Sequence, residues 1–268
     1  MAALALQGRT ALVTGSSRRA GIGFAIARRL ACAGASVFLH HHVAHDRAVA
    51  TGADPGGIAA VLDAVRAARA DPHARVEDAG ADLVAPGAPE ALVAGAVERL
   101  GALDILVCNH ATSRPDAGIG GLDAAMIDEH YAVNTRASLL LAQAFAGVHD
   151  DARPGGRIVF MTSGQDQGPM REEIAYAASK GALASVTETI SDGLIDRGIT
   201  VNCVNPGPVD TGWASPELTA AVRERLPAGR WGEPDDPARL ILWLVSDEGR
   251  WITGQVINSE GGFRRWDP

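Results

Sequence analysis

The sequence lacks the features that mark several large classes of protein. Its three cysteines, Cys32, Cys108 and Cys203, lie in separate apolar stretches and show neither a C-x-x-C pair nor the Cys/His spacing of a metal site. No apolar run approaches the ~18 residues that a membrane span needs, and the chain does not begin with a basic segment followed by an apolar one. We therefore expect a cytoplasmic protein with reduced thiols, no bound metal and no membrane segment.

An excess of basic residues is also absent. The 24 Lys and Arg residues stand against 32 Asp and Glu residues, which gives a formal net charge of −8, whereas a nucleic-acid surface needs a basic stripe. Small molecules are therefore the expected partners. Because the 268 residues show no repeat, no low-complexity tract and no linker, and 47% of them are hydrophobic, the sequence predicts one globular domain over residues 1–268.

A tyrosine and a lysine stand four positions apart at Tyr176 and Lys180. If this segment is helical, both side chains lie on one face, and the ammonium group lowers the pKa of the phenol from its ordinary value near ~10 toward neutral pH. Ser163, at the end of the apolar run 155–163, would offer a hydroxyl to the same substrate oxygen. The alternative is a chance pair on an exposed helix and an ordinary turn serine.

A glycine-rich loop follows the first apolar run of the chain. Residues 10–15 end in Gly15, then come Gly21 and Gly23, and an Ala/Ile/Leu-rich segment continues to Ala33. The expected order is strand, loop and helix, in which glycines let the backbone approach a pyrophosphate at the helix N-terminus. The alternative is a tight turn without a ligand.

Together these motifs resemble the short-chain dehydrogenase/reductase family. The resemblance spans nearly the whole chain and is closest to the 3-oxoacyl-[acyl-carrier-protein] reductase branch in segments 229–234 and 252–262. Like the seven βα-like units of the sequence, it predicts one Rossmann-like, doubly wound parallel sheet with helices on both faces. It implies a cofactor half at about 8–160, a catalytic and substrate half at about 161–265, and a substrate lid at about 212–228.

The resemblance implies four catalytic residues. Tyr176 would exchange a proton with the substrate oxygen, Ser163 would stabilise the charge that develops there, and Lys180 would lower the tyrosine pKa while binding the cofactor ribose. In the family the residue that matches Asn134 distorts its helix and holds a water that relays protons to the lysine. The alternative for Asn134 is a structural hydrogen bond inside a helix.

The implied cofactor site draws on the glycine loop and on the ends of several strands. Asp82 and Leu83 would hold the adenine edge, or Asp82 would cap a helix. Residues 109–111 resemble the family's Asn-Asn-Ala-Gly turn, and residues 206–211 resemble its segment over the nicotinamide. The predicted residues, besides Tyr176 and Lys180, are Gly15, Ser17, Arg18, Arg19, Gly21, Ile22, Gly23, His41, Asp82, Leu83, Asn109, His110, Ala111, Pro206, Gly207, Val209 and Thr211.

The predicted cofactor is NADP(H) rather than NAD(H). The strand that begins at residue 36 ends in histidines, where an acidic residue would bind a ribose 2′-hydroxyl, and no acid precedes Asp46. Arg18 and Arg19 lie in a glycine loop two residues longer than usual and resemble the basic residues that hold a 2′-phosphate. His41 falls near the usual place of the acid. These histidines would contact the phosphate or simply face solvent.

These patterns predict an NADP(H)-dependent reductase of ketones, with 3-oxoacyl thioesters as the expected substrate class. Two alternatives stay open: an NAD-dependent dehydrogenase of secondary alcohols such as sugars or steroids, and a dinucleotide-binding regulator without turnover.

The helical segments 124–148 and 176–197 carry more apolar and Ala positions than one sheet face can cover. We therefore expect a homotetramer or a homodimer.

Overall fold

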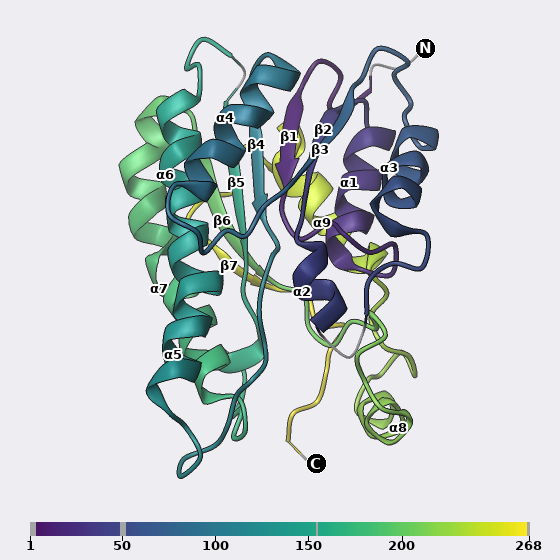
Figure 1. The fold of residues 1–268 in the computed structure, drawn as a ribbon, viewed down its shortest axis with the longest axis vertical. Helices are drawn as coiled ribbons and strands as arrows, with labels where there is room; N and C mark the ends of the chain where they lie inside the picture. Colours follow the sequence, from purple (N-terminus) through teal and green to yellow (C-terminus); the bar gives the residue numbers. More distant parts are fainter. Residues whose placement is uncertain (1–3, 49–51, 154, 267–268) are drawn as a thin grey trace.

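A computed structural model describes residues 4–48, 52–153 and 155–266. Its centre is one sheet of seven strands in the order β3-β2-β1-β4-β5-β6-β7, and every neighbouring pair is parallel (Figure 1). The strands are β1 Thr10–Val13, β2 Ser36–His41, β3 Val76–Gly80, β4 Ile105–Cys108, β5 Arg157–Met161, β6 Thr200–Asn205 and β7 Val256–Asn258. This topology confirms the predicted doubly wound, single-domain Rossmann-like fold.

Helices cover both faces of the sheet. In Figure 1, α1, α3 and α9 lie on one side, and α4, α6 and α7 lie on the other. The helices are α1 Ile22–Cys32, α2 Val43–Ala48, α3 Gly57–Ala67, α4 Ala88–Leu100, α5 Ala124–His130, α6 Ala137–Val148, α7 Ile174–Leu194, α8 Pro216–Glu224 and α9 Asp235–Val245. Among the residues described, no helix is long and apolar enough to cross a membrane.

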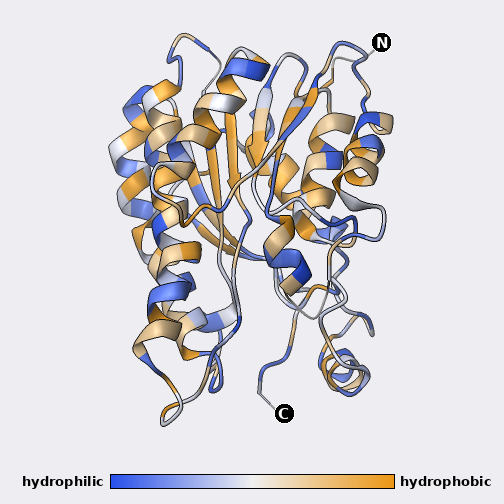
Figure 2. Cartoon of the chain, in the orientation of Figure 1, coloured by the Kyte–Doolittle hydropathy of each residue, from blue (hydrophilic) through white to orange (hydrophobic). Residues whose placement is uncertain are grey.

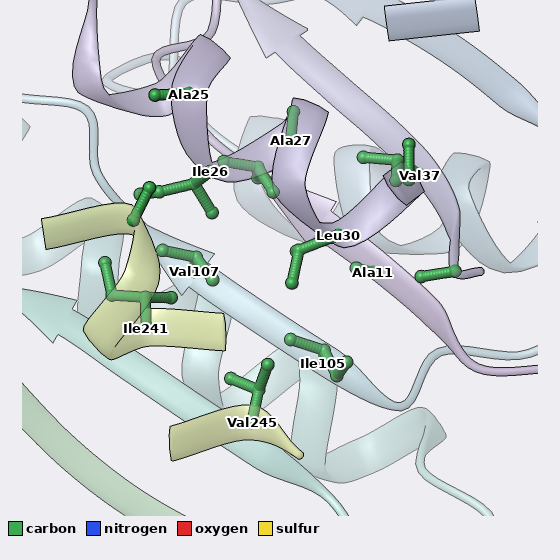
Figure 3. Close-up of a cluster of buried hydrophobic side chains, with 14 of the residues drawn as sticks. Ala11, Ala25, Ile26, Ala27, Leu30, Val37, Ile105, Val107, Ile241 and Val245 are labelled. Carbon is green, nitrogen blue, oxygen red and sulfur yellow. The ribbon is translucent and has the colours of Figure 1, made fainter. Parts of the chain in front are cut away.

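Side-chain alternation along the strands produces two hydrophobic cores. On β1, Ala11 and Val13 pack toward α1 and α9, whereas Leu12 between them packs toward α4 and α6. Figure 3 shows the first core, where Ile26 and Leu30 of α1 lie beside α9. Because both faces of the central strands β1, β4 and β5 are buried, these strands are apolar along most of their length, and Figure 2 shows apolar strands at the centre of the sheet.

The long helix predicted over residues 124–148 is not continuous. It divides into α5, a π-helical segment over Tyr131–Arg136, and α6. Asn134 lies in the π-helical segment, so the expected distortion of the helix around this residue is confirmed.

The parallel strands bring distant segments together at their carboxyl ends. Gly15 follows β1, Asn109 follows β4, Ser163 follows β5 and Asn205 ends β6. The direction of winding reverses between β1 and β4, which is the switch point where open α/β sheets bind ligands. The fold therefore places the predicted catalytic and cofactor segments at one edge of the sheet.

Candidate active site

A cavity of about 1420 Å³ lies at the carboxyl edge of the sheet. It exceeds the ~300–1,000 Å³ of most small-molecule pockets, so it has room for a dinucleotide and a substrate together. It is lined by the glycine loop, the ends of β4 and β5, the segment after β6 and the C-terminal tail. The predicted site residues on its wall are Gly15, Ser17, Arg18, Gly21, Ile22, Asp82, Leu83, Asn109, His110, Ala111, Ser163, Tyr176, Gly207 and Thr211.

The backbone of the glycine loop packs closely against neighbouring segments, and two of its glycines make this possible. Gly15 has φ +67°, and a Cβ there would lie 2.8 Å from the Cα of His110. Gly23 does not line the cavity, but a side chain there would overlap the carbonyl oxygen of Gly15, so glycine lets α1 pack against the loop. Gly21 is the N-cap of α1, whose first turn has neither a side-chain cap nor an acidic residue. This helix end suits an anion such as pyrophosphate.

The turn after β4 supports the glycine loop from behind. The Asn109 side-chain amide donates to the carbonyl oxygens of Thr14 and Gly15 at 3.1 and 3.0 Å. The Nε2 of His110 lies 3.0 Å from the carbonyl oxygen of Val133, so Nε2 carries the proton, and Nδ1 pairs with the Thr14 hydroxyl at 2.7 Å. Burial lowers the pKa of His110 to about 3, which keeps the ring neutral.

The two arginines of the loop take different positions. Arg18 lines the cavity and donates to the carbonyl oxygen of Thr211 at 2.7 Å. Arg19 does not line the cavity, because its guanidinium binds both carboxylate oxygens of Asp54, with distances of 2.8 to 3.2 Å. Hydrogen bonds from Arg19 lower the pKa of Asp54 to about 2. Of the predicted pair, only Arg18 therefore has a guanidinium on the cavity wall.

The prediction that His41 contacts the cofactor is not supported by its position. His41 does not line the cavity, and its Nε2 lies 3.0 Å from a carboxylate oxygen of Asp78 on β3. Successive side chains of a strand point to opposite faces, so His40 and His42 face the cavity instead. His40 is buried, its Nδ1 accepts the backbone N–H of Gly15, and its Nε2 donates to the carbonyl oxygen of Ala81 just after β3; burial lowers its pKa to about 4.

One acidic residue, Asp46, lies beyond the end of β2 in the sequence but lines this part of the cavity in the fold. The short helix α2 was not predicted, and it brings His45 and Asp46 onto the cavity wall beside His42. Asp46 is 8% exposed, and its Oδ2 has no hydrogen-bond partner among the described residues. The cavity end near β2 therefore holds both histidines and a buried carboxylate.

Asp82 and Leu83 line the cavity as predicted, but Asp82 does not cap a helix. Its carboxylate accepts the backbone N–H of Val84 at 3.0 Å, whereas the N-cap of α4 is Gly87. The alternative of a helix N-cap is therefore wrong, because a five-residue turn separates Asp82 from the helix start at Ala88.

The segment after β6 contributes two of its four predicted residues to the cavity wall. Gly207 and Thr211 line it, while Pro206 does not and Val209 is buried. Gly207 has φ +69°, and a Cβ there would lie 2.6 Å from the Cα of Glu260. Pro206 and Val209 therefore shape this segment without lining the cavity.

Ser163 and Tyr176 form the polar centre of the cavity. Ser163 follows β5, and Tyr176 is the third residue of α7. Burial raises the pKa of Tyr176 to about 12, and a hydrogen bond with Ser163 acts in the opposite direction. At neutral pH the phenol therefore keeps its proton and can donate it to an oxygen atom in the cavity.

Lys180 lies one helical turn beyond Tyr176 and is 2% exposed. Its Nζ donates to the carbonyl oxygen of Met161 at 2.8 Å and lies 5.9 Å from the centroid of the Tyr176 ring. Burial lowers the pKa of Lys180 to about 8. The expected lowering of the tyrosine pKa is not found in this geometry, because burial of the phenol raises it and the nearby carboxylate of Glu173 adds to that effect.

The Asn134 side chain is completely used in structural hydrogen bonds. Its oxygen accepts the backbone N–H of Thr112 at 2.8 Å, and its amide donates to the carbonyl oxygen of Thr112 at 3.0 Å and to the hydroxyl of Ser179 at 2.9 Å. The side chain is buried and does not line the cavity. It ties the π-helical segment to α7, and a role in proton relay stays a prediction.

One residue of the cavity wall, next to the segment of Ser163, was not predicted by any pattern in the sequence. Arg265, in the C-terminal tail, lines the cavity and binds both carboxylate oxygens of Glu260. A side chain at Gly164 would overlap the guanidinium of Arg265, so the glycine that follows Ser163 leaves room for this arginine. The tail lies beyond the last strand and has no periodic pattern that would place it.

These features fit a nicotinamide dinucleotide and a carbonyl substrate. The uncapped start of α1 and the guanidinium of Arg18 suit phosphate groups, while Ser163 and Tyr176 present two hydroxyls to one region of the same cavity. Two hydroxyls that converge on one oxygen atom can hold a carbonyl group and supply its proton.

Known proteins share this sequence and fold. A family model described as enoyl-(acyl carrier protein) reductase matches residues 15–264. The uncharacterized oxidoreductase YjdA of Bacillus subtilis is 41% identical over 260 residues, which cover 97% of this chain and 98% of that protein.

Two solved structures have closely similar folds. A dehydrogenase/reductase from Sinorhizobium meliloti 1021 has a TM-score of 0.83 and 37% identity, with 97% of this chain and 96% of that chain covered. A short chain dehydrogenase from Burkholderia cenocepacia J2315, solved in complex with NADP, has a TM-score of 0.82 and 36% identity, with 96% and 98% covered.

Proposed function

This chain belongs to the short-chain dehydrogenase/reductase family and is an NAD(P)-dependent oxidoreductase, and from that premise we propose that it uses NADP(H) to reduce ketones. The observation that carries the proposal is that Ser163 and Tyr176 line the same cavity as the glycine loop. We take 3-oxoacyl thioesters and related ketones as the substrate class. The last segments of the chain, which resemble that branch of the family, support this choice.

The chain's own residues supply acid chemistry. Ser163 and Tyr176 donate hydrogen bonds to the carbonyl oxygen, and Tyr176 passes its proton to that oxygen as negative charge develops there. Lys180, when protonated, favours the tyrosinate that this step leaves behind. A nicotinamide held along the cavity supplies the hydride. The reverse oxidation uses the same groups in the opposite order.

The preference for NADP(H) rests on Arg18 and on the histidines that follow β2. Arg18 lines the cavity, His42 and His45 lie on its wall, and the Burkholderia relative was solved with NADP. The residues that would hold the dinucleotide phosphates are those of the glycine loop, the start of α1 and Arg18. A guanidinium group binds a phosphate dianion well, which favours the phosphorylated dinucleotide.

A second candidate is an NAD-dependent dehydrogenase of secondary alcohols, and Asp46 is the observation that favours it. A buried carboxylate oxygen with no described partner is suited to accept a hydrogen bond from a ribose hydroxyl. The same carboxylate would repel a 2′-phosphate. The choice between the two candidates therefore depends on whether Arg18 or Asp46 lies nearer to the bound adenosine ribose.

Initial-rate kinetics would test the proposal. Purified enzyme is assayed with NADPH and with NADH against a 3-oxoacyl thioester, a simple ketone and an aldehyde, and with NAD⁺ against sugar and steroid alcohols. We expect the highest kcat/KM with NADPH and the thioester. Turnover of alcohols with NAD⁺ at higher kcat/KM would establish the second candidate. Tight dinucleotide binding without turnover of any substrate would indicate a regulator.

We also propose that the enzyme is a cytoplasmic homotetramer or homodimer. Its three cysteines are unpaired, which suits a reducing compartment. The exposed apolar residues Val148 at the end of α6 and Ile195 after α7, 41% and 43% exposed, lie on the helical layer predicted to pair across two-fold axes. Light scattering at micromolar concentration is expected to give two or four chains, and a monomer would contradict the proposal.

A further inference from the structure

The N-terminus of the catalytic helix α7 is satisfied by a loop that is distant in the sequence. The N-cap residue of α7, Glu173, makes no side-chain cap, and the first turn contains no acidic residue. The helix would therefore leave the N–H groups of Ile174, Ala175 and Tyr176 without acceptors of its own, since Ala177 is the first residue bonded back to Glu173.

Asp116 and Ala117 accept all three of these N–H groups. The carboxylate of Asp116 accepts Ala175 at 3.0 Å and Tyr176 at 2.8 Å, and the carbonyl oxygen of Ala117 accepts Ile174 at 3.5 Å. The two carboxylate oxygens of Asp116 are divided between the two helical residues. One acidic side chain from the loop between β4 and α5 thus replaces the N-cap that α7 lacks.

The Asp116 carboxylate is enclosed. Its side chain is fully buried and also accepts the backbone N–H of Ala117 at 2.8 Å. Burial alone would raise the pKa of Asp116, but the backbone N–H groups of Tyr176, Ala175 and Ala117 together hold it below its usual range. The group is therefore a carboxylate at neutral pH, in the charge state that a helix N-terminus favours.

A buried histidine completes the surroundings of Tyr176. His130, at the end of α5, is fully buried, and its Nδ1 donates to the carbonyl oxygen of Met126 at 2.8 Å. Its Nε2 faces the Asp116 carboxylate at 3.8 Å, and its ring meets the Tyr176 ring edge to face with centroids 6.3 Å apart. α5 and α7 lie side by side in Figure 1. The backbone of Tyr176 is therefore held by the loop before α5, and its ring is in contact with His130 at the end of α5.

The other end of the loop is fixed as well. The backbone of Thr112 is held by Asn134, which also bonds to Ser179 of α7. The loop therefore joins α7 both at its first turn and one turn further on. Tyr176 lies in the first turn, where helices fray, whereas Lys180 lies inside the helix and is held by β5.

From these contacts we propose that Asp116 is a positioning residue, which fixes the first turn of α7 and so holds the Tyr176 hydroxyl in reach of Ser163 and the substrate oxygen. The inference rests on the proposed role of Tyr176 as proton donor. Because proton transfer requires close approach of the two oxygens, a small displacement of the first turn would slow the chemical step while leaving the dinucleotide site unchanged.

The substitution Asp116→Asn tests this. Asparagine has the same shape as aspartate but only one side-chain oxygen that can accept a hydrogen bond. Its NH₂ group would face one of the two helix N–H groups, where the second carboxylate oxygen of Asp116 now lies. We expect kcat to fall by about 10- to 100-fold, with the Kd for NADPH unchanged by fluorescence titration. The kinetic isotope effect with 4-deuterated NADPH is expected to rise, because the chemical step becomes rate-limiting.

Asp123→Asn is the matched control. Asp123 is the N-cap of α5 and accepts the N–H of Met126 at 2.8 Å, so the substitution makes the same carboxylate-to-amide change at a helix that does not carry Tyr176. We expect its kcat to stay near that of wild type. Equal kcat in Asp116→Asn and wild type would overturn the inference, as would a loss of NADPH affinity as large as the loss of kcat.

A double variant separates this inference from the function on which it rests. If Asp116 acts through Tyr176, adding Asp116→Asn to Tyr176→Phe lowers the residual rate no further. A further tenfold loss would contradict the inference, and normal turnover in Tyr176→Phe alone would instead contradict the proposed mechanism. Should the amide variant not fold, Asp116→Glu displaces the carboxylate by one methylene. The same split between kcat and Kd is expected, and wild-type kcat in that variant would overturn the inference.

Discussion

At the scale of single residues, the catalytic centre depends on how burial acts on two neighbouring groups. Burial raises the pKa of Tyr176 to about 12 and lowers that of Lys180 to about 8. Both shifts favour the neutral form, which is the usual result when a charge is removed from water. A protonated phenol is the species that carbonyl reduction consumes, so burial keeps Tyr176 in the required state, while release of its proton depends on a group that favours the tyrosinate, such as protonated Lys180.

Removing the phenol hydroxyl tests this directly. Tyr176→Phe is expected to lower kcat by about 10²–10⁴-fold, the usual contribution of a general acid, while the Kd for NADPH stays close to that of wild type. Tyr131→Phe is the control, since Tyr131 is the other tyrosine of the chain and lies 40% exposed on the π-helical segment. Comparable kcat values in the two variants would contradict the role of Tyr176.

Cofactor choice is also decided by individual side chains. We expect Arg18→Ala to lower the ratio of kcat/KM for NADPH to that for NADH by about tenfold or more, because one charge-assisted contact contributes roughly 1.5–3 kcal/mol. Arg19→Ala serves as the control and should leave the ratio unchanged, since Asp54 already binds that guanidinium. The reverse result, with Arg19 dominant, would mean that the ion pair with Asp54 opens when the dinucleotide binds.

At the scale of elements, the C-terminal tail lines the same cavity as Ser163 and Tyr176. Arg265→Ala would remove the guanidinium beside Gly164 and leave the carboxylate of Glu260 without its counter-charge, with the side-chain amide of Asn205 as a remaining donor. We expect a higher KM for the carbonyl substrate and an unchanged Kd for NADPH. Arg264→Ala, at an exposed neighbour of the same charge, is the control. A change in NADPH affinity with constant substrate KM would show that the tail acts on the dinucleotide instead.

The elements themselves were largely predictable from local patterns. Continuous apolar runs identified the central strands β1, β4 and β5, because helices cover both faces of the sheet there. The glycine loop and α7 followed from glycine spacing and from a long segment without proline. Even the distortion at Asn134 was expected from the family resemblance, and the π-helical segment Tyr131–Arg136 confirms it.

What the sequence did not reveal was which side chains pair across the fold. Arg19 was assigned to a phosphate, but Asp54 lies 35 positions away and binds it. His41 was placed at the ribose, but Asp78 of the adjacent strand turns it away. These pairs depend on strand register and loop path, which no local pattern encodes. Family motifs predicted Ser163, Tyr176 and Lys180 as the reacting groups but gave no sign of Asp116, the loop residue that caps α7.

At the scale of the whole molecule, the edge of the sheet opposite the cavity is fixed by a buried cluster of charges. Asp104, just before β4, is fully buried and accepts the backbone N–H and hydroxyl of Thr10 at 2.9 and 3.0 Å. It also binds Arg153 through both carboxylate oxygens at 2.6 and 2.7 Å, and Arg9 lies 3.7 Å away. One carboxylate therefore connects β1, β4 and the loop before β5.

Substituting this carboxylate is expected to weaken the whole fold. Asp104→Asn leaves the buried guanidinium of Arg9 and that of Arg153 without a counter-charge, and breaking a buried pair in this way costs about 3–5 kcal/mol. Urea unfolding at neutral pH, at one fixed protein concentration, should show this loss in the free energy of unfolding. Asp151→Asn removes an exposed carboxylate from the same kind of pair with Arg197 and should change stability little, since water and salt screen it.

The effect of pH on the stability of wild type and of Asp104→Asn follows from the direction in which the pKa of Asp104 is shifted. Burial of Asp104 opposes ionisation, but hydrogen bonds from Arg153 and Thr10 outweigh it and hold the pKa of this carboxyl below its usual range. The carboxylate's contribution is therefore fully present above the unfolded pKa of ~3.9 and is lost as the pH falls through the lower folded value. The stability difference between wild type and Asp104→Asn should accordingly stay constant from pH 7 to pH 5 and shrink below pH 4. A difference that stayed constant down to pH 2 would show that the substitution acts through packing of the cluster and not through its charge.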